Sequence, residues 1–586
     1  MKSNTKEQKN ALSMRDALNE FKNLKMVETH DESKDWRDGL WHYPDVIEKI
    51  FKGAVPFSYI FLFSLIAFLF VLFLQSKAFA NVLKEGSFSN DRYSEGMVGA
   101  LSSFNPLFAT TNYVDKAIDS LIFEKFVYID QDGKPKSGVA KSWTASKDSL
   151  TYTFTINEDL YWQDGTELTV DDVLFTFNTA ISLASDDSVG AALVGIDIVK
   201  VDDKTLQFTL TEANPTFYEA VSIYIIPQKE FEDIDLGLIR TAFVNNAMGS
   251  GKYMIEKKEQ NAVYLVDNPY DSYFPKLKNI ELRIYPDFSS LETAMRVGDI
   301  DALGSWDNEA LSFMQEYTSF GVLSKTEDFR NRTLFLNLRK ENLKDKNVRI
   351  GINYLLDVNN LLKESNIQGE VMHGPYPDDS WAFNDEISYY DYNPEKAVTF
   401  LKTAGYTKNS ETGYYESKEN KILSFTLSYL DNNINNRLVD VIVKLFDKEG
   451  IVIKPDSLDY NEISQQTIAK RDFEMLLYEV ETTVDPDQYN LWHSLKVDDP
   501  NLNLSGYQYE RVDILLEDAR KTTNEAVRKT KYLQFQRYLM ADAPVIFLYH
   551  PSFVFYFDSK LKGVDLDNTN FSYERYWNIE DWYWTY

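Results

Sequence analysis

The sequence predicts an α/β protein of two lobes that follow one N-terminal transmembrane helix. The chain has 586 residues, which is too long for one core. The run from Gly53 to Ser76 carries no charge, and about 20 apolar residues span a bilayer as a helix. Beyond that run, strand and helix patterns alternate, which is typical of sheets covered by helices.

The composition restricts the possible partners and chemistry. A formal net charge of −30 makes nucleic acid an unsuitable partner, because a phosphate backbone needs a basic surface. The acidic surface is interpreted first as a source of solubility and second as an attraction for cationic ligands. The chain contains no cysteine. Disulfides, thiolate metal sites, cysteine nucleophiles and a lipid-modified cysteine anchor are therefore excluded.

Residues Met1 to Lys52 are polar and mixed in charge, and we expect them to form a cytoplasmic tail. Lys49 and Lys52 precede the apolar run closely, whereas Lys77 and Lys84 follow it. This weak bias favours an N-terminus on the cytoplasmic side.

Ala78-Phe79-Ala80 has the small-x-small pattern of a signal-peptidase site, so cleavage stays open. The long preceding tail and the length of the apolar run favour an uncleaved signal anchor. We therefore expect a single-pass protein of the cell membrane, with everything after about Val82 outside the cytoplasm.

The stretch from Ile156 to Asn178 predicts a strand end, a turn and a helix. Asp164-Gly165 predicts a turn, because glycine accepts a positive φ and the aspartate side chain hydrogen-bonds the nearby backbone. Thr169 and Asp172 have the spacing of a capping box at a helix start. The helix then has one apolar face, formed by Val173, Leu174 and Phe177.

The rest of the first region contains further elements of both kinds. The patterns predict a helix over Ala117–Phe126, a hairpin turn at Asp132-Gly133, a strand with Tyr152, Phe154 and Ile156 on one face, strands near Asp197–Val201, Thr205–Leu210 and Glu281–Tyr285, and a helix over Ser289–Val297 closed by Gly298.

One glycine-rich segment, Ala247 to Met254, invites comparison with a phosphate-binding loop. The first glycine of that loop is absent at Asn246, and Tyr253 replaces the Ser or Thr that should follow Lys252. We therefore expect only a turn into a strand.

The second region predicts mostly helix-covered sheet. Its best helix is Tyr392–Tyr406, where Asn393 caps the start, Pro394 lies in the first turn and Gly405 ends it. The other expected elements are a strand at Arg332–Leu338, a β–α–β unit of Leu423–Ser428, Ile434–Lys448 and Ile451–Lys454, helices at Val512–Arg520 and Ala526–Met540, and a strand in APVIFLYHP.

Several blocks carry a resemblance to a known family. They include LSSFNPLFATTNYVDKAIDSLIFEKFVYID, INEDLYWQDGTELTVDDVLFTFN, VDNPYDSYFPKLKNIELRIYPDFSSLETAMRVGDIDAL, KDKNVRIGINYLLDVNNLL and RDFEMLLYEVETTVDPDQYNLWHS. In this order they resemble the family 5 extracellular solute-binding proteins, the peptide- and nickel-binding receptors of ABC importers. The resemblance covers about Gly99 to Trp577.

The resemblance implies a two-lobe periplasmic-binding-protein-like clamp of type II. Lobe one would be 82–330 plus 549–586, and lobe two 331–548. The chain would be a membrane-tethered receptor that captures a peptide or peptide-like solute, with an ABC permease and ATPase as partners and no cofactor. No Gly-x-Ser-x-Gly or His-Glu-x-x-His is present, so an enzyme is not expected. The alternatives are a sensor or scaffold of the same fold, or a receptor for a sugar or nickel chelate.

The resemblance also points to ligand-binding residues. In the family's peptide binders, an acid that meets the ligand's α-amine lies three residues before an Asp-Pro pair, a position held here by Thr482. Glu481 and Glu479 flank it, but a neighbour one residue away points to the other strand face. Recognition of a free peptide N-terminus is therefore weakened, and longer, N-blocked or non-peptide ligands stay open.

The remaining candidates are Asp485, as a turn residue or ligand contact, Tyr478 and Trp306, as core or cleft residues, and Asn105 and Tyr113, where the family's first lobe contributes loop contacts. His373 and His493 are the only histidines expected near the cleft. No pair of histidines has metal-ligand spacing, so we expect no metal site.

Overall fold

The computed structural model describes residues 92–585, except 109–111, 185–188, 232–233, 242, 244–245 and 308–318, and the side chains of 236, 237 and 240. The predicted tail, the predicted membrane segment Gly53–Ser76 and the Ala78–Ala80 site lie outside these residues. In the part that is described, no helix has both the length and the apolar character that a membrane crossing needs.

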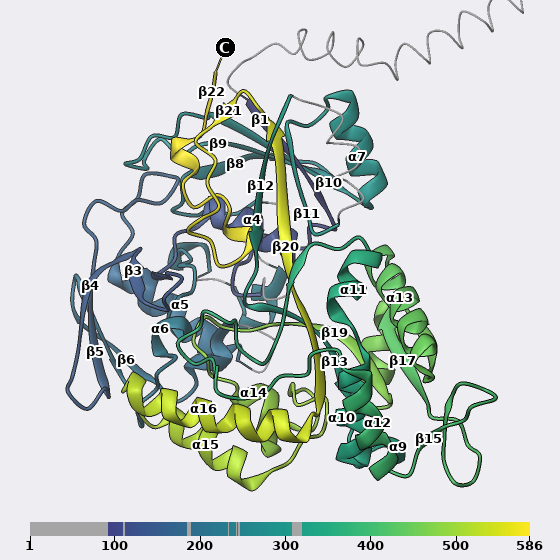
Figure 1. Ribbon diagram of the computed structural model, residues 1–586. Coiled ribbons are helices and arrows are strands. Elements are labelled where there is room, and N and C mark those ends of the chain that lie inside the picture. The colour runs from purple at the N-terminus through teal and green to yellow at the C-terminus, as the bar shows by residue number, and fades with distance from the viewer. Residues whose placement is uncertain are drawn as a thin grey trace, which may run out of the picture. The chain divides into compact units, whose positions relative to one another are not determined.

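One mixed sheet of twelve described strands organises the protein (Figure 1). Its strands follow the order β18-β17-β19-β13-β20-β11-β1-β10-β9-β8, and β12 and β14 also pair with β20. Their bounds are β1 Arg92–Val98, β8 Tyr253–Lys258, β9 Ala262–Asp267, β10 Asn279–Tyr285, β11 Ala302–Ser305, β12 Phe320–Thr326, β13 Arg330–Leu336, β14 Gly369–Val371, β17 Ser424–Leu430, β18 Val452–Leu458, β19 Met475–Glu481 and β20 Val545–Asp558.

Strand β20 belongs to both halves of this sheet. Its first part pairs with β13, with Val545 opposite Phe335, and its second part pairs with β12, with Ser552 opposite Thr326. Buried apolar residues gather in separate clusters on the two sides, 93–303 with 553–582 and 334–549. We call these regions lobe one and lobe two and keep for them the ranges proposed above.

Lobe one has a second, antiparallel sheet in the order β4-β5-β7-β6. Its strands are β4 Ala140–Ala145, β5 Thr151–Ile156, β6 Asp197–Asp202 and β7 Thr205–Thr209. On β5 the predicted alternation is confirmed, because Tyr152, Phe154 and Ile156 are buried. Helix α5 (Val170–Ser182) packs Phe177 against Phe208, with 5.1 Å between ring centroids.

The start of α5 confirms the predicted capping box. The Thr169 N–H donates to Asp172 Oδ2 at 2.9 Å, and the other carboxylate oxygen accepts from the Gln228 N–H. Asp172 therefore fixes both the helix start and the segment after β7. In the preceding turn Gly165 has φ +82°, as the Asp-Gly pair predicted.

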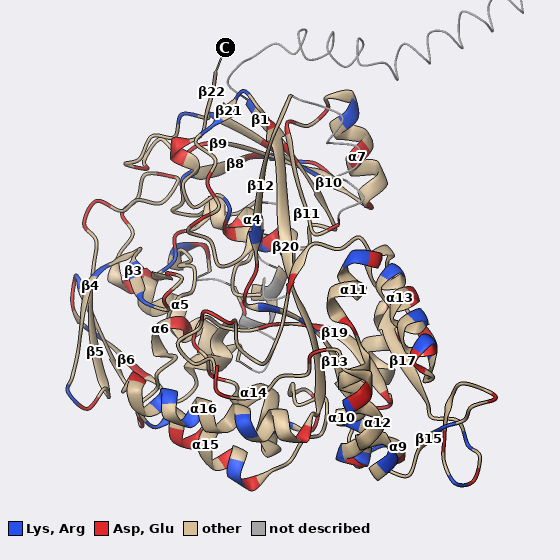
Figure 2. Ribbon diagram, viewed as in Figure 1, with Lys and Arg blue, Asp and Glu red and all other residues tan. Residues whose placement is uncertain are grey.

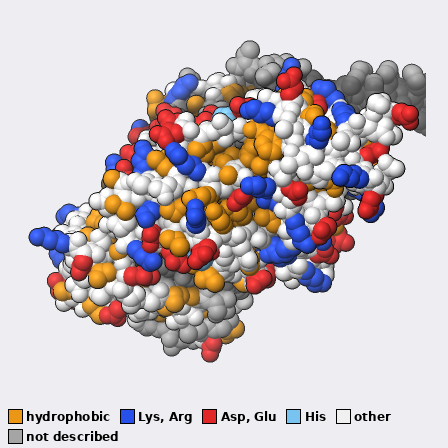
Figure 3. Space-filling model, turned by 60° about the horizontal axis from the view of Figure 1, so that its bottom comes forward, with side chains coloured by type: hydrophobic (Ala, Val, Ile, Leu, Met, Phe, Trp, Pro, Cys, Tyr) orange, Lys and Arg blue, Asp and Glu red, His pale blue; other side chains and the backbone are white. Residues whose placement is uncertain are grey.

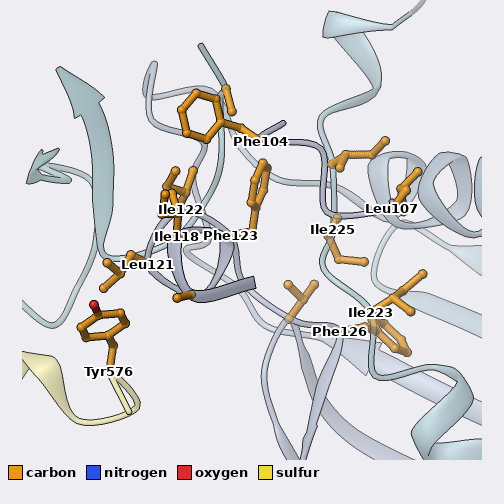
Figure 4. Close-up of a cluster of buried hydrophobic side chains, with 14 of the residues drawn as sticks. Phe104, Leu107, Ile118, Leu121, Ile122, Phe123, Phe126, Ile223, Ile225 and Tyr576 are labelled. Carbon is orange, nitrogen blue, oxygen red and sulfur yellow. The ribbon is translucent and has the colours of Figure 1, made fainter. Parts of the chain in front are cut away.

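The predicted helix Ala117–Phe126 is wrong at both ends, because α4 spans Tyr113–Ile122. Asn112 Oδ1 accepts from the N–H groups of Val114 and Asp115, which starts the helix earlier. After Ile122 the chain runs extended, and the Phe126 N–H donates to the Ile223 carbonyl. Phe123 and Phe126 enter the same core as the helix without being part of it (Figure 4).

The glycines of the rejected phosphate loop have a packing role. A Cβ on Gly249 would lie 1.9 Å from the carbonyl oxygen of Ile122, the last residue of α4. The Gly251 N–H donates to that same oxygen at 2.7 Å. The chain then enters β8, so the expected turn into a strand is confirmed.

Other local predictions in lobe one are confirmed with shifted ends. β2 (Val127–Ile129) and β3 (Pro135–Ser137) form the hairpin, with Gly133 at φ +74°. Helix α7 (Phe288–Val297) ends at Gly298, which has φ +78°.

Lobe two contains the predicted β–α–β unit, in which α13 (Asn433–Glu449) connects the parallel strands β17 and β18. Helix α12 spans Pro394–Thr403, and Asn393 Oδ1 accepts from the Lys396 N–H. The remaining longer helices are α10 Lys346–Leu355, α11 Val358–Glu364, α15 Glu510–Arg520 and α16 Glu525–Asp542. Figure 2 shows acidic and basic residues interspersed along α15 and α16.

Short elements complete the described chain. They are α6 Phe217–Ala220, α9 Glu341–Lys344, α14 Tyr489–Trp492, β15 Thr407–Lys408, β16 Tyr415–Glu416, β21 Leu561–Lys562, β22 Tyr583–Trp584 and the helical turns 189–193, 228–230, 236–241, 462–468, 494–496, 572–574 and 579–581. On the face in Figure 3, apolar and charged side chains lie intermixed.

The C-terminal segment packs into lobe one through a buried ion pair. Arg575 and Glu95 are fully buried, and Arg575 Nη2 lies 2.6 Å from Glu95 Oε1. The hydroxyls of Tyr93 and Tyr576 donate to the second carboxylate oxygen. Every charged atom in this network has a partner, so neither charge is left buried and uncompensated. Since Glu95 lies on β1 and Arg575 in the C-terminal segment, the pair joins these two parts of the chain.

Candidate functional site between the lobes

Three of the described cavities have walls from both lobes, and two of them, cavity A and cavity B, share Val484 and Asn570. Cavity A measures about 390 Å³, and cavity B about 450 Å³. Such volumes are in the range of small-ligand sites, roughly 300–1,000 Å³. A third cavity, between Leu210 and Arg520, contains none of the predicted site residues.

Each cavity has walls from both lobes. Cavity A is lined from lobe one by Lys116, Lys125, Glu219, Tyr224, Tyr573 and Glu574, and from lobe two by Glu481, Thr482, Thr483 and Val484. Cavity B is lined from lobe one by Asp132, Lys325, Asp328 and Phe329, and from lobe two by Asp379, Trp381 and Glu525.

Glu481 is one of the predicted site residues that contact both lobes. It ends β19 in lobe two, and its Oε1 accepts from Lys116 Nζ of α4 at 2.8 Å. The hydroxyl of Tyr573, also from lobe one, donates to the same oxygen at 3.3 Å. Glu481 therefore forms a bond between the lobes at the wall of cavity A.

Glu479 lies two residues earlier on the same strand. It forms ion pairs with Arg330 at 3.3 Å and Arg332 at 3.4 Å, both on the neighbouring strand β13. Those arginines hold Glu479 at the crossing between the lobes, and Glu479 does not line cavity A or B as described.

Thr482, at the position where the family pattern has an acid, lines cavity A. Its N–H and its hydroxyl both donate to the Phe329 carbonyl, at 2.7 and 3.2 Å. Thr482 thus continues the pairing of β19 with β13 beyond Glu481 and Arg330. Whether Thr482, Glu481 or Glu479 contacts a ligand stays a prediction.

Asp485 is engaged within lobe two. Its carboxylate accepts from both terminal nitrogens of Arg528 on α16, at 2.7 and 2.5 Å. Burial lowers the pKa of the Arg528 guanidinium, but the Asp485 carboxylate outweighs this and raises it. The Asp485 N–H reaches into lobe one and donates to Glu219 Oε1 at 2.7 Å.

Glu219 is a cavity residue that the sequence did not indicate. It lies on the single-turn helix α6 of lobe one, and its Oε2 is enclosed without a hydrogen-bond partner among the described residues. Burial and the nearby Asp485 carboxylate raise its pKa to about 8. No motif surrounds it, so only the folded chain brings it to the cavity.

Cavity B contains a second unusual acid. Burial, followed by the neighbouring Asp379 carboxylate, raises the pKa of Asp328 to about 6. Asp328 lies in the link between β12 and β13, where the chain leaves lobe one.

Tyr478 faces away from the two glutamates of β19. Its ring packs against the lobe-two core that contains Leu476 and Val480. Burial raises the pKa of its hydroxyl. The ring is partly buried against this core, and a ligand contact for Tyr478 stays a prediction.

Trp306 and Tyr113 contact each other edge to face, with 5.0 Å between ring centroids. Trp306 Nε1 donates to Glu327 at 2.6 Å, and the Tyr113 hydroxyl accepts from Arg575 at 2.8 Å. Both rings thus lie in the charged network of lobe one, outside the described walls of cavities A and B.

Asn105 is buried, and its amide donates to the Ile239 carbonyl at 2.8 Å. Its neighbour Pro106 lines cavity A instead. A ligand contact for Asn105 remains an untested prediction.

His493 and His373, the two histidines expected near the cleft, contact other side chains of lobe two. His493 is buried, stacks on Tyr489 at 4.1 Å and lies 3.1 Å from Glu517. His373 Nδ1 lies 2.9 Å from Asp378. Within the described ranges, no three His, Cys, Asp or Glu side chains are placed to hold a metal ion.

Comparisons with known proteins extend this description. Residues 134–501, more than half of the chain, match the family described as bacterial extracellular solute-binding proteins, family 5 middle. The oligopeptide-binding protein AppA of Bacillus subtilis (strain 168) is 24% identical over 503 residues, which cover 83% of this chain and 90% of that protein.

Solved structures agree. NikZ from Campylobacter jejuni in complex with Ni(L-His) superposes with a TM-score of 0.73 at 25% identity, covering 85% of this chain and all of NikZ. AppA from Bacillus subtilis in complex with a nonapeptide has the same fold, with a TM-score of 0.70 at 23% identity, covering 84% and 99% of the two chains.

Proposed function

Since this chain belongs to the bacterial extracellular solute-binding proteins of family 5, we propose that it captures peptides or peptide-like solutes for import. It would deliver them to the permease and ATPase subunits of an ABC importer. The observation that carries the proposal is the pair of cavities whose walls come from both lobes.

A ligand in such a cavity favours the state in which the lobes are in contact. A ligand that bonds both walls at once lowers the free energy of the closed state relative to the open one. Strands β13 and β20, which connect the lobes, are the segments about which the lobes would separate. Capture and release therefore need no chemical step, and we propose no reaction.

A peptide suits the chemistry of these walls. Cavity A combines the rings of Tyr224 and Tyr573 with ion-paired lysines and carboxylates. Polar groups with room for water accept many side chains, because water adapts to each of them. AppA, which has the same fold, is described in complex with a nonapeptide.

We also propose that Gly53–Ser76 anchors the receptor in the cell membrane, with the N-terminus in the cytoplasm. The support is the uncharged apolar run of the sequence together with the absence of a cysteine for lipid attachment. The lobes would then work outside the cytoplasm, tethered beside their permease.

The peptide assignment can be tested on the full chain purified in detergent. Mass spectrometry of the ligand retained after purification should show peptides, and a peptide pool should bind in a calorimetric titration. Retention of only a sugar or a nickel chelate would exclude the peptide assignment while leaving the receptor class intact.

A substitution in the shared wall tests whether the peptide binds in these cavities. Val484 lines both of them, so Val484→Trp should fill shared space and abolish titration by the peptide pool. Val398→Trp is the matched control, since Val398 is 46% exposed on α12 of lobe two and should leave binding unchanged.

A further inference from the structure

Lobe one carries a concentrated group of exposed aromatic side chains. Tyr270, Tyr273 and Phe274, between β9 and β10, are 47%, 66% and 66% exposed. Trp577 and Tyr583 of the C-terminal segment are 41% and 42% exposed. These five, the aromatic surface, are most of the exposed aromatic side chains in the described residues; the others are Tyr161, Tyr392 and Tyr460.

Two lysines hold the two segments together as one surface. Lys252 Nζ lies 5.6 Å from the Tyr273 ring centroid and donates to the Trp577 carbonyl at 3.1 Å. Lys276 Nζ lies 5.1 Å from the Tyr583 ring centroid. Each lysine also pairs with an acid, Glu580 or Asp581, so the surface is close to neutral on an acidic protein.

The backbone at Phe274 is strained. Its φ is +47°, a region that bulky residues rarely occupy. The strain does not bury the ring, which stays two-thirds exposed. Pro275 and Leu277 beside it are buried and fix the loop, so the phenyl ring is presented to the outside at an energetic cost. Clustered exposed apolar side chains of this kind mark interaction surfaces.

The aromatic surface lies at the end of lobe one that connects to the proposed membrane anchor. Arg92, where the described chain begins, pairs with Asn279, five residues after Phe274. Figure 1 shows β21, β22 and β1 at the same end. Only residues 77–91 separate Arg92 from the proposed anchor, and fifteen residues reach at most about 50 Å.

We propose that the aromatic surface docks lobe one onto the headgroup region of the lipid bilayer. This rests on the proposed anchor at Gly53–Ser76. Tyr and Trp favour that region because one end of each side chain is apolar and the other polar. The contact can be weak, since the tether keeps the local lipid concentration high. Because the lysines are paired, docking uses the rings rather than net charge and needs no anionic lipid.

The test uses the absence of native cysteine, which lets a single substitution carry one fluorophore. Ser272→Cys places the label between Tyr270 and Tyr273 without changing any ring, and Ser457→Cys places it on an exposed site of lobe two. The full chain is reconstituted into phosphatidylcholine vesicles that contain a nitroxide-labelled lipid. We expect the label at 272 to lose about half of its emission, as for a site within the headgroup boundary, and the label at 457 to lose little.

A further variant assigns the effect to the rings. Tyr273→Ser with Phe274→Ser, in the Ser272→Cys chain, should abolish the quenching and leave flotation with the vesicles unchanged. Equal quenching at 272 and 457, or none at 272 in chains that float with the vesicles, would overturn the docking alone. Chains that do not float would overturn the anchor, and the docking with it.

Discussion

Lys116 Nζ of lobe one lies 2.8 Å from Glu481 Oε1 of lobe two, which joins α4 directly to the end of β19. Other bonds also cross between the lobes, among them Arg437 to Asp307 at 2.5 Å and the Asp485 N–H to Glu219 at 2.7 Å. The lobes therefore make direct contacts that add to whatever bonds a captured ligand supplies.

Removing the Lys116–Glu481 bond should weaken ligand capture. Glu481→Gln keeps the shape and removes the charge, so the closed state loses the exposed ion pair with Lys116, worth about 0.2–1 kcal/mol. Arg330, which lies 3.6 Å from the other Glu481 oxygen, keeps Glu327 and Glu479 as partners. Affinity for the retained peptide, measured by calorimetry, should fall by up to about fivefold. Lys116→Met should give the same loss, and the double variant no more than either.

The control for this pair is Glu419→Gln, which removes an exposed charge of lobe two that pairs with the neighbouring Lys421. It should leave affinity unchanged. A loss of a hundredfold or more in Glu481→Gln would contradict a simple latch and indicate that Glu481 binds the ligand itself.

A disulfide across the lobes should block entry to the cavities. Ser149 Oγ of lobe one and Thr523 Oγ1 of lobe two lie 3.1 Å apart. The chain has no other cysteine, so Ser149→Cys with Thr523→Cys can form only this bond. The oxidised, ligand-free protein should not take up peptide, and reduction should restore binding.

The two single variants serve as controls and should bind peptide in both redox states. Uptake by the oxidised double variant at the rate of the reduced one would show that ligand enters without separation of the lobes.

Asp485→Asn should destabilise lobe two strongly. Arg528 is 5% exposed, and the substitution leaves its charge buried without its partner. The expected loss of unfolding free energy is about 3–5 kcal/mol, measured by denaturant titration of tryptophan fluorescence. Asp472→Asn removes an exposed acid paired with Lys340 and should cost less than about 1 kcal/mol. Similar losses for the two variants would contradict the burial of Arg528.

Glu219 should make stability depend on pH. Its pKa is raised from 4.5 to about 8, so the folded state holds this proton more tightly than the unfolded chain. The contribution is fully present below pH 4.5 and is lost as the pH rises through 8. Glu219→Gln should therefore flatten the fall in thermal midpoint between pH 5 and 8.5, whereas Glu212→Gln, at an exposed cavity residue, should leave it intact.

Local hydrogen bonding explains where the sequence predicted the fold well. The Thr169–Asp172 cap, the Asn393 cap of α12 and the left-handed Gly298 each depend on residues within four positions, so a short stretch of sequence contains the whole cause. The error at Ala117–Phe126 has a distant cause. Phe126 is extended because it pairs with Ile223, about a hundred residues later, although its spacing from α4 is helical.

The candidate site likewise contains residues that the sequence predicted and residues that it missed. The Asp-Pro motif located the segment of Glu481, Thr482 and Asp485, and the structure places Glu481 and Thr482 in the wall of cavity A. Lys116 and Glu219 were missed, since nothing in their own neighbourhood distinguishes them from other charged residues. They reach the cavity only because β13 and β20 bring the lobes together.

The sequence by itself determined the family, many of the helices and strands, and the stretch of lobe two that forms part of the cavity wall. Ordered motifs and capping residues contain that information locally. Tertiary structure alone decided which charges meet: Glu481 with Lys116, Asp485 with Arg528, and Glu219 enclosed beside Asp485. The physical reason is that charge pairing and desolvation depend on distances in space, between residues separated by up to several hundred positions along the chain.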